Sequence, residues 1–280
     1  MMADIKLKCR GKENMLRIIL VTLIIPVVNI SGYPAGQKLQ IAPDHSLAPT
    51  IYIQKGLPAS DRYWDAQDYL QAAKVLQALA GIDTTQLPRH GSLISGAVFA
   101  RIVSHDNFKL FENPVLNLQQ RFKAATAILE GLGQITIVYA SATTQERIFD
   151  SEMIELMRYV LDISAKVTQL ADAFIASLPS NDPDHEVRLK GREQMQQGMA
   201  RVVIGCLDSL AERATYQSPD LLRLAKTLDT TVPVIFPFLL PGSQQELSLR
   251  IPKMIEEEPN PSIKDLLRDL AAALAKPKAG

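Results

Sequence analysis

The sequence predicts a mainly all-α protein, an antiparallel multi-helix bundle with long helices. Apolar residues recur at alternating steps of three and four over residues 115–139, 149–178 and 195–210, the spacing that places an apolar stripe on one helix face. The connections between these segments are short, so consecutive helices should lie antiparallel. Hydrophobic residues make up 47% of the 280 residues, which is enough for a large core.

Residues 1–32 are predicted to be a signal peptide or an N-terminal anchor. Basic residues precede the apolar run Ile18–Val28, and small residues follow it, which is the order found in secretory signals. Initiation at Met1 or at Met15 would give the same topology. The run is shorter than the about 20 residues of a spanning helix, and a buried first helix remains the alternative. We expect a periplasmic or otherwise extracytoplasmic protein.

Residues 33–255 are expected to form the bundle domain, beginning with an extended arm. Alternating patterns at residues 38–41 and 50–54 are typical of short strands. A similar pattern at residues 246–251 would pair with them in a small β element.

The helices of this domain follow in chain order. The first is expected over residues 61–81 with Ser60 as its N-cap. A shorter second helix is expected over residues 93–103. Three long helices, over the segments that begin near Val115, Phe149 and Asp182, precede a short helix over residues 218–228.

The C-terminal part breaks the helical pattern. Three prolines at four-residue spacing disfavour a regular helix over residues 231–242, so we expect an extended segment that completes the core. The acidic, proline-containing stretch 256–261 is expected to be a stiff linker. It leads to an amphipathic helix over residues 262–275, and residues 256–280 form the third part of the chain.

Charge and motifs exclude several classes of function. Residues 33–280 hold 25 basic and 28 acidic residues, so we expect no nucleic-acid partner. No phosphate-binding glycine loop is found, and no cofactor is expected. Cys206 lies in an apolar stretch and is expected to be a buried free thiol. The lack of usable N-glycosylation sites in this part favours a bacterial envelope protein.

A catalytic alternative comes from one segment that contains a serine, two histidines and an aspartate. These residues are His90, Ser92, His105 and Asp106. Together with nearby carboxylates, either histidine would serve an envelope hydrolase. The serine lacks the G-x-S-x-G elbow, however, and the same letters fit a loop that enters a helix.

Two acidic clusters are candidate binding sites. Asp182, Asp184, His185 and Glu186 would suit a divalent cation, although they equally suit a helix N-terminus, and no metal is expected. Asp61, Trp64, Asp65 and Asp68 lie close together on the first predicted helix and would form a face that contacts a protein partner.

The leading hypothesis is an exported, non-catalytic helical binding module, such as an adaptor or immunity-like protein. Its partner is expected to be another protein, and membrane contact would occur only through an uncleaved N-terminal segment. A further alternative is a small-molecule sensor with a cavity between the long helices. Four methionines would line that cavity: Met153, Met157, Met195 and Met199.

Overall fold

The structure is a computed structural model that describes residues 50–59, 62–146, 148–179, 185–213 and 215–276. Within these residues there is no strand, and the predicted all-α class is confirmed. The α-helices are α2 (Thr50–Gln54), α3 (Ala66–Ile82), α4 (Gly96–Ile102), α5 (Lys109–Glu112), α6 (Leu118–Glu146), α7 (Asp150–Ala176), α8 (His185–Ala211), α9 (Ser218–Ile235), α10 (Pro241–Glu257) and α11 (Pro261–Leu274). Short 3-10 helices are η1 (Thr84–Gln86), η2 (His105–Phe108) and η3 (Phe236–Phe238).

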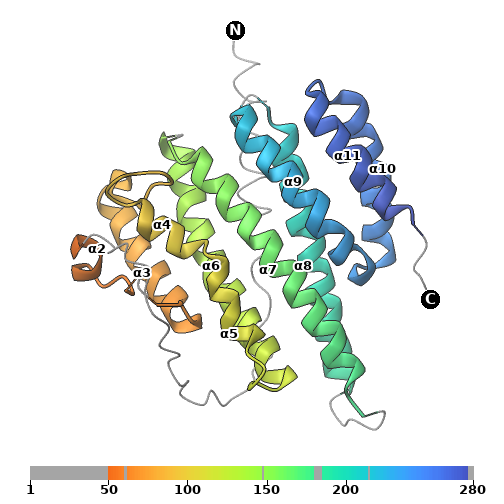
Figure 1. Ribbon diagram of the computed structural model, residues 1–280, viewed down its shortest axis with the longest axis horizontal. Coiled ribbons are helices and arrows are strands. Elements are labelled where there is room, and N and C mark those ends of the chain that lie inside the picture. The colour runs from red at the N-terminus through yellow and green to blue at the C-terminus, as the bar shows by residue number, and fades with distance from the viewer. Residues whose placement is uncertain (1–49, 60–61, 147, 180–184, 214, 277–280) are drawn as a thin grey trace.

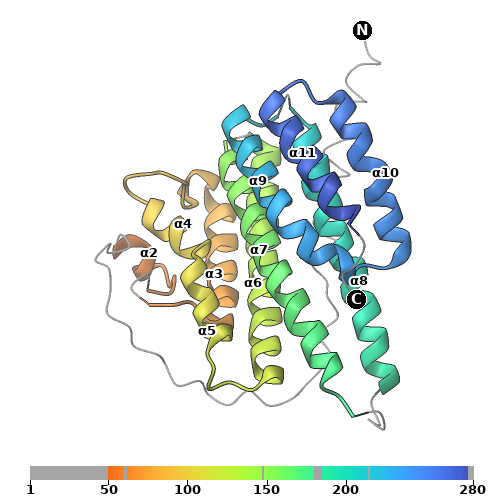
Figure 2. The same ribbon diagram turned by 45° about the vertical axis from the view of Figure 1, so that its right-hand side comes forward.

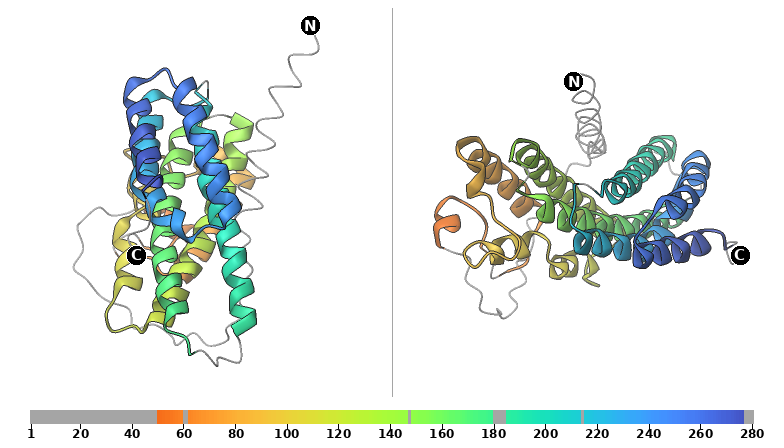
Figure 3. Two further views of the ribbon diagram at one scale, coloured as in Figure 1. Left: turned by 90° about the vertical axis from the view of Figure 1, so that its right-hand side faces the viewer. Right: turned by 90° about the horizontal axis from the view of Figure 1, so that it is seen from above.

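The long helices lie side by side in a row with α7 at its centre (Figures 1 and 2). In this row α3 packs against α6, α6 against α7, α7 against α9, and α9 against α11. Helix α8 contacts α7, α9 and α10, and it lies to one side of the row (Figure 3). Consecutive long helices run antiparallel, as their short connections predict (Figure 1).

Helix α7 is enclosed on nearly every side. Between Glu152 and Leu170 its positions that are not buried form one polar stripe at helical spacing: Glu155, Arg158, Asp162, Lys166 and Gln169. Four members of the stripe form salt bridges: Glu155 with Arg158 and Arg223, Asp162 with His105, and Lys166 with Glu112. The stripe therefore ties α7 to α9 on one side and to η2 and α5 on the other.

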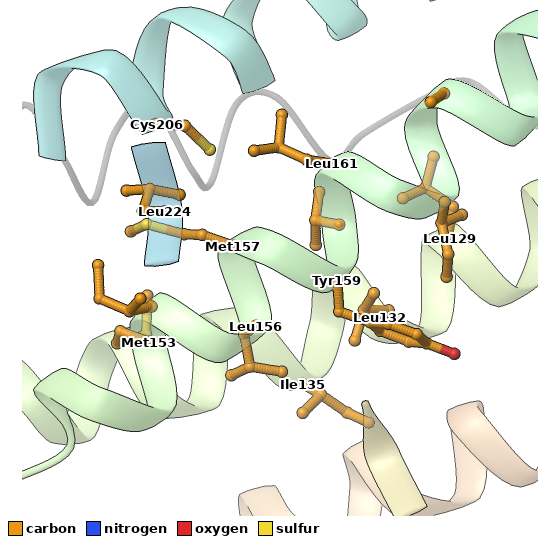
Figure 4. Packing of buried hydrophobic residues seen from close by; sticks show 14 of the residues in the cluster. Leu129, Leu132, Ile135, Met153, Leu156, Met157, Tyr159, Leu161, Cys206 and Leu224 are labelled. Carbon is orange, nitrogen blue, oxygen red and sulfur yellow. The ribbon is translucent and has the colours of Figure 1, made fainter. Parts of the chain in front are cut away.

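Apolar side chains of α6, α7, α8 and α9 meet in the core (Figure 4). The four methionines of the sensor hypothesis, Met153, Met157, Met195 and Met199, are all buried members of this core. Burying one such side chain stabilises the fold by about 1.5–3 kcal/mol. Core packing is therefore a sufficient reason for their helical spacing.

The predicted β element is wrong where the structure describes it. Residues 50–54 form α2, residues 246–251 lie inside α10, and residues 38–41 lie outside the described part. In α10 the side chains of Leu247 and Ile251, four residues apart, are buried, whereas Leu249 between them is exposed. The alternation at residues 246–251 therefore belongs to an amphipathic helix. Over only six residues, apolar positions can fit the spacing of a helix and that of a strand equally well.

The expected extended segment at residues 231–242 is also wrong. Helix α9 continues through Pro233 to Ile235, η3 follows, and Pro241 occupies the start of α10, where a missing N–H costs little. The Gln244 side-chain amide donates to the carbonyl oxygens of Phe236 and Leu239, at 2.9 and 3.0 Å. Side-chain donors thus satisfy carbonyls at the helix junction. The segment does complete the core, since Ile235, Phe238 and Leu239 are among its buried residues.

The stretch 256–261, expected to be a stiff linker, contains the end of α10 and the start of α11. Glu258 is buried between them: its Oε1 accepts from the Asn260 backbone N–H at 2.8 Å, and its Oε2 lies 3.2 Å from Arg213. Asn260 caps α11. The predicted amphipathic helix is present, and it packs on α9 and α10.

Candidate functional site

The acidic face predicted to bind a partner is largely built into the fold. Asp61 lies outside the described residues. Trp64 is fully buried, and its indole Nε1 donates to the Ala59 carbonyl at 2.8 Å. Asp65 is the N-cap of α3, and the buried Asp68 closes a capping box with it. The described members therefore do not share one exposed face.

Helix α3 starts later than predicted, because Asp65 serves as its N-cap. Ser60, the expected N-cap, lies outside the described residues, and α3 begins at Ala66. The Asp65 carboxylate accepts from the backbone N–H groups of Gln67 and Asp68, at 2.9 and 3.0 Å. Aspartate is as good an N-cap as serine, so the sequence offered two competing starts.

A buried polar network surrounds Asn107. Its Nδ2 donates to Tyr69 Oη at 2.8 Å, and its Oδ1 accepts from the Trp64 backbone N–H at 3.0 Å. Tyr159 Oη lies 3.1 Å from Tyr69 Oη and donates to the Ser104 carbonyl at 2.8 Å. Burial raises the pKa of Tyr159 to about 12 and raises the pKa of Tyr69 well above its ordinary value. Both phenols remain protonated donors that join α3, η2 and α7.

His90 and Ser92, the first pair of catalytic candidates, have separate contacts. The His90 ring meets Phe99 edge-on, with 5.8 Å between ring centroids. The Ser92 hydroxyl accepts from the backbone N–H groups of Ile94 and Ser95, both at 3.2 Å. Ser92 thus shapes a turn.

His105 and Asp106, the second pair, face different partners again. His105 Nε2 lies 2.8 Å from Asp162 Oδ2, and the ring packs edge-on against Tyr159. Asp106 accepts from Lys109 Nζ at 2.8 Å, and that hydrogen bond lowers the pKa of Asp106. In the described contacts, neither residue forms a hydrogen bond with His90 or Ser92, so the structure does not bring the four candidates together; His105 instead pairs with the carboxylate of Asp162.

The predicted metal ligands fall mostly outside the described part. Asp182 and Asp184 are not described, and of His185 only its place at the start of α8 is described. Glu186 is exposed in the first turn of that helix. Among the described residues no group of three or more potential ligands is gathered for a metal ion.

Cys206 is a buried free thiol, as expected. Burial raises the pKa of this thiol to about 12. Because the thiolate is the nucleophilic form, Cys206 is suited to packing rather than to chemistry.

The α3–α4 loop, residues 88–95, is a surface feature with a well-defined structure. Hydrogen bonds connect it to α6, to α7 and to the turn between these two helices. Tyr139 Oη of α6 donates to the Pro88 carbonyl at 2.7 Å. Arg89 Nε and the His90 backbone N–H both donate to Glu152 Oε1 of α7, at 3.0 and 2.7 Å. One buried carboxylate thus fixes two consecutive residues of the loop.

Arg89 makes two further contacts with the turn between α6 and α7. Its Nη2 donates to the Ile148 carbonyl at 2.5 Å, and its guanidinium carbon lies 4.8 Å from the centroid of the Phe149 ring. Hydrogen bonds and stacking together hold the planar guanidinium in one orientation.

The loop is also braced internally. Ser95 Oγ accepts from the Arg89 backbone N–H at 2.9 Å, and the Gly96 N–H donates to the Ser92 carbonyl at 2.8 Å. Gly91 has φ +69°, a left-handed conformation that glycine adopts without strain. These bonds close the turn that ends at α4.

At the tip of this braced loop two large aliphatic side chains face solvent. Leu93 is fully exposed and Ile94 is 70% exposed. Half of the exposed large apolar side chains among the described residues lie in α2, at the end of α3 or in this loop: Ile53, Ile82, Leu93 and Ile94. These elements share one edge of the molecule (Figures 1 and 2).

Glu152 is itself unusual, because its side chain is only 1% exposed. Its Oε2 is buried and has no hydrogen-bond partner among the described residues. Burial and the nearby Glu152 carboxylate together raise the pKa of Tyr139 well above its ordinary value. A buried carboxylate with an unsatisfied oxygen is costly, and here it organises the loop.

The sequence did not predict this loop, because Leu93 and Ile94 fit the pattern of a helix over residues 93–103. Helix α4 instead begins at Gly96, with Ser95 as its N-cap residue. The signal that was available is local: Gly91, Ser92 and Ser95 are turn formers.

No known protein family, no curated protein and no solved structure matches this chain. Among the described residues, no helix is both long and apolar enough to cross a bilayer.

Proposed function

We propose that this protein is a non-catalytic helical binding module that docks a protein partner through the α3–α4 loop. The observation that carries the proposal is the pairing of two solvent-facing aliphatic side chains, Leu93 and Ile94, with a backbone fixed by Glu152. Exposed aliphatic side chains cost solubility, so their placement on a braced loop favours a docking role.

Preorganisation supports the same proposal. A loop that is already held in its bound shape loses little conformational entropy when a partner covers it. Interaction energy is commonly concentrated in a few apolar anchors within a polar surround. Leu93 and Ile94 are two such anchors on a loop whose other side chains include Arg89, His90, Ser92 and Ser95.

We further propose that the protein works outside the cytoplasm, in a bacterial envelope. The support is the order of basic, apolar and small residues in segment 1–32. Cell fractionation with N-terminal sequencing tests it: a processed or envelope-associated product is expected, and an unprocessed cytoplasmic product would contradict the proposal.

Site-specific photo-cross-linking in cells tests the docking loop. A photoreactive amino acid at position 93 should give one discrete adduct with a protein, whereas the same group at Leu249 of α10, which is also exposed, should not. Excess wild-type protein should compete the adduct away, and the double variant L93D/I94D should not. Equal labelling at both positions, or none, would refute the docking loop.

The variant Glu152→Leu tests whether the hydrogen bonds from Arg89 and His90 to Glu152 are needed for docking. Leu93 and Ile94 themselves are unchanged in this variant. Because the Arg89 and His90 donors lose their acceptor, the loop should exchange its amide hydrogens faster, and adduct formation at position 93 should fall. L249D is the control for a surface change, and it should alter neither measurement. An unchanged adduct yield despite faster exchange would show that preorganisation is unnecessary.

A further inference from the structure

We infer that the partner of the α3–α4 loop is an acidic protein segment, in which a carboxylate pairs with Arg89 beside apolar side chains that cover Leu93 and Ile94. The inference rests on the proposed function and adds the chemistry of the partner.

The first support is the local charge. No aspartate or glutamate occurs from Thr84 to His105, although the whole chain has 30 acidic and 30 basic residues. The same stretch contains Arg89, His90, Arg101 and His105. The loop itself, residues 88–95, therefore carries basic side chains and no acidic one. Complementary charge favours an acidic segment as its partner.

The second support is the position of the Arg89 ion pair. Its Glu152 carboxylate is 1% exposed, whereas the Arg89 side chain is 39% exposed. The guanidinium thus lies between the carboxylate and the solvent. A partner would contact the positive member of the pair.

The third support is the hydrogen-bonding capacity that Arg89 retains. A guanidinium has five N–H donors. In the described part of the chain, Nε donates to Glu152 and Nη2 to the Ile148 carbonyl, while Nη1 makes no hydrogen bond. The guanidinium is also fixed against Phe149, so its outer N–H groups are presented in one orientation. Planar, fixed guanidinium groups pair well with carboxylates.

An anionic membrane surface also combines negative charge with apolar material, but it fits less well. Electrostatic binding to such a surface typically uses clusters of about 4–8 basic residues. This loop presents Arg89 and the exposed His90. A protein segment needs only one well-placed carboxylate.

Selection from a phage-displayed random peptide library tests the inference directly. Peptides are selected on the purified full chain and counter-selected on L93D/I94D. The enriched peptides should combine aliphatic or aromatic residues with a net negative charge. Neutral or basic enriched peptides would overturn the inference while leaving the docking loop intact. Absence of any enrichment, together with no adduct at position 93, would refute both proposals.

Charge variants then separate pairing from loop structure. Arg89→Gln should weaken the best selected peptide about tenfold, which corresponds to one lost charge-assisted hydrogen bond. Glu152→Gln keeps an acceptor oxygen for the loop but removes the negative charge that the Arg89 guanidinium now neutralises. The peptide carboxylate would then pair with Arg89 without a competing charge, so the peptide should bind several-fold more tightly. If Arg89 acted only through loop structure, Glu152→Gln would leave binding unchanged, because the acceptor oxygen is kept; an affinity that is unchanged or weaker would therefore overturn the inference.

Two controls complete the experiment. Arg268→Gln removes an exposed arginine of α11 that pairs with the exposed Asp265, and it should leave the peptide affinity unchanged. The second control uses vesicles that contain anionic phospholipid. The wild-type chain should not bind them more strongly than L93D/I94D does. Such binding would overturn the inference in favour of a membrane surface.

Discussion

The two ends of the helix row are held together by different forces. At the α2–α5 end, the connections are irregular and buried polar groups fix them: Asn107, Tyr69 and Tyr159 around η2, and Glu152 under the α3–α4 loop. At the α9–α11 end, three regular helices lie side by side (Figure 1) and pack through aliphatic side chains such as Leu267 and Leu270, while the buried carboxylate of Glu258 fixes the α10–α11 connection. The difference follows from geometry, because helices satisfy their own backbone groups and loops do not.

The polar end is also where aliphatic side chains can stay exposed on a loop of fixed shape. Hydrogen bonds are directional, so they hold a loop in one shape even when its side chains face solvent. Apolar packing holds an element only by covering its side chains. A loop that presents bare aliphatic groups therefore needs polar bracing beneath it.

Asn107→Ala should have the largest effect of the changes considered, because it removes the centre of the polar end. It would cost about 4 kcal/mol of unfolding free energy, from several lost hydrogen bonds and the unsatisfied groups left behind. Urea denaturation measures it. A loss below about 1 kcal/mol would show that the polar end does not depend on this network.

Leu267→Ala is the matched test of the apolar end. Deleting a fully buried leucine side chain from α11 should cost about 3 kcal/mol. Exchange of the α10 and α11 amides should accelerate while exchange in the α3–α4 loop stays unchanged. Equal acceleration at both ends would mean that the two regions are one cooperative unit.

Gly131→Ala tests the contact between α6 and α3 in the polar half. A Cβ at this position would lie 2.6 Å from Tyr69 Cβ, so the two helices would have to separate. The expected loss is about 2 kcal/mol, typical of overpacking. The control is Gly81→Ala in α3, where nothing lies within 4 Å of the added Cβ; it should leave stability unchanged or slightly raised.

Asp229→Asn should have the smallest effect, at the apolar end. Burial, and then the charge of Asp269 on α11, raise the pKa of Asp229 above its ordinary 3.8. The folded state therefore binds this proton more tightly, and ionisation destabilises it at every pH above the folded pKa. The variant should be more stable at pH 7 by less than about 0.5 kcal/mol, since the site is only partly buried.

The Asp229 effect should disappear as the pH falls below 3.8, where both states of the wild-type carboxyl are protonated. Thermal unfolding of wild type and variant between acidic and neutral pH checks this. A difference that persists unchanged in acid would show that the ionised carboxyl is not its cause.

Periodicity predicted the long helices well, but short patterns were less reliable. The spacing over residues 149–178 predicted α7, and the amphipathic pattern after residue 261 predicted α11. Over five or six residues the strand and helix patterns overlap, so residues 50–54 and 246–251 were misassigned. At residues 231–242 the prolines were misleading, because Pro237 and Pro241 lie at the starts of η3 and α10, where a missing N–H costs little, and α9 accommodates Pro233.

By itself, the sequence determined the all-α class, the long helices and the burial of Cys206, because these depend on local spacing and composition. Only the tertiary structure decided which polar residues are structural and which surface is exposed. Trp64 and Asp68 became buried, whereas Leu93 and Ile94 remained outside. The reason is distance along the chain. Glu152 lies 62 residues from His90, so no local sequence pattern predicts their hydrogen bond.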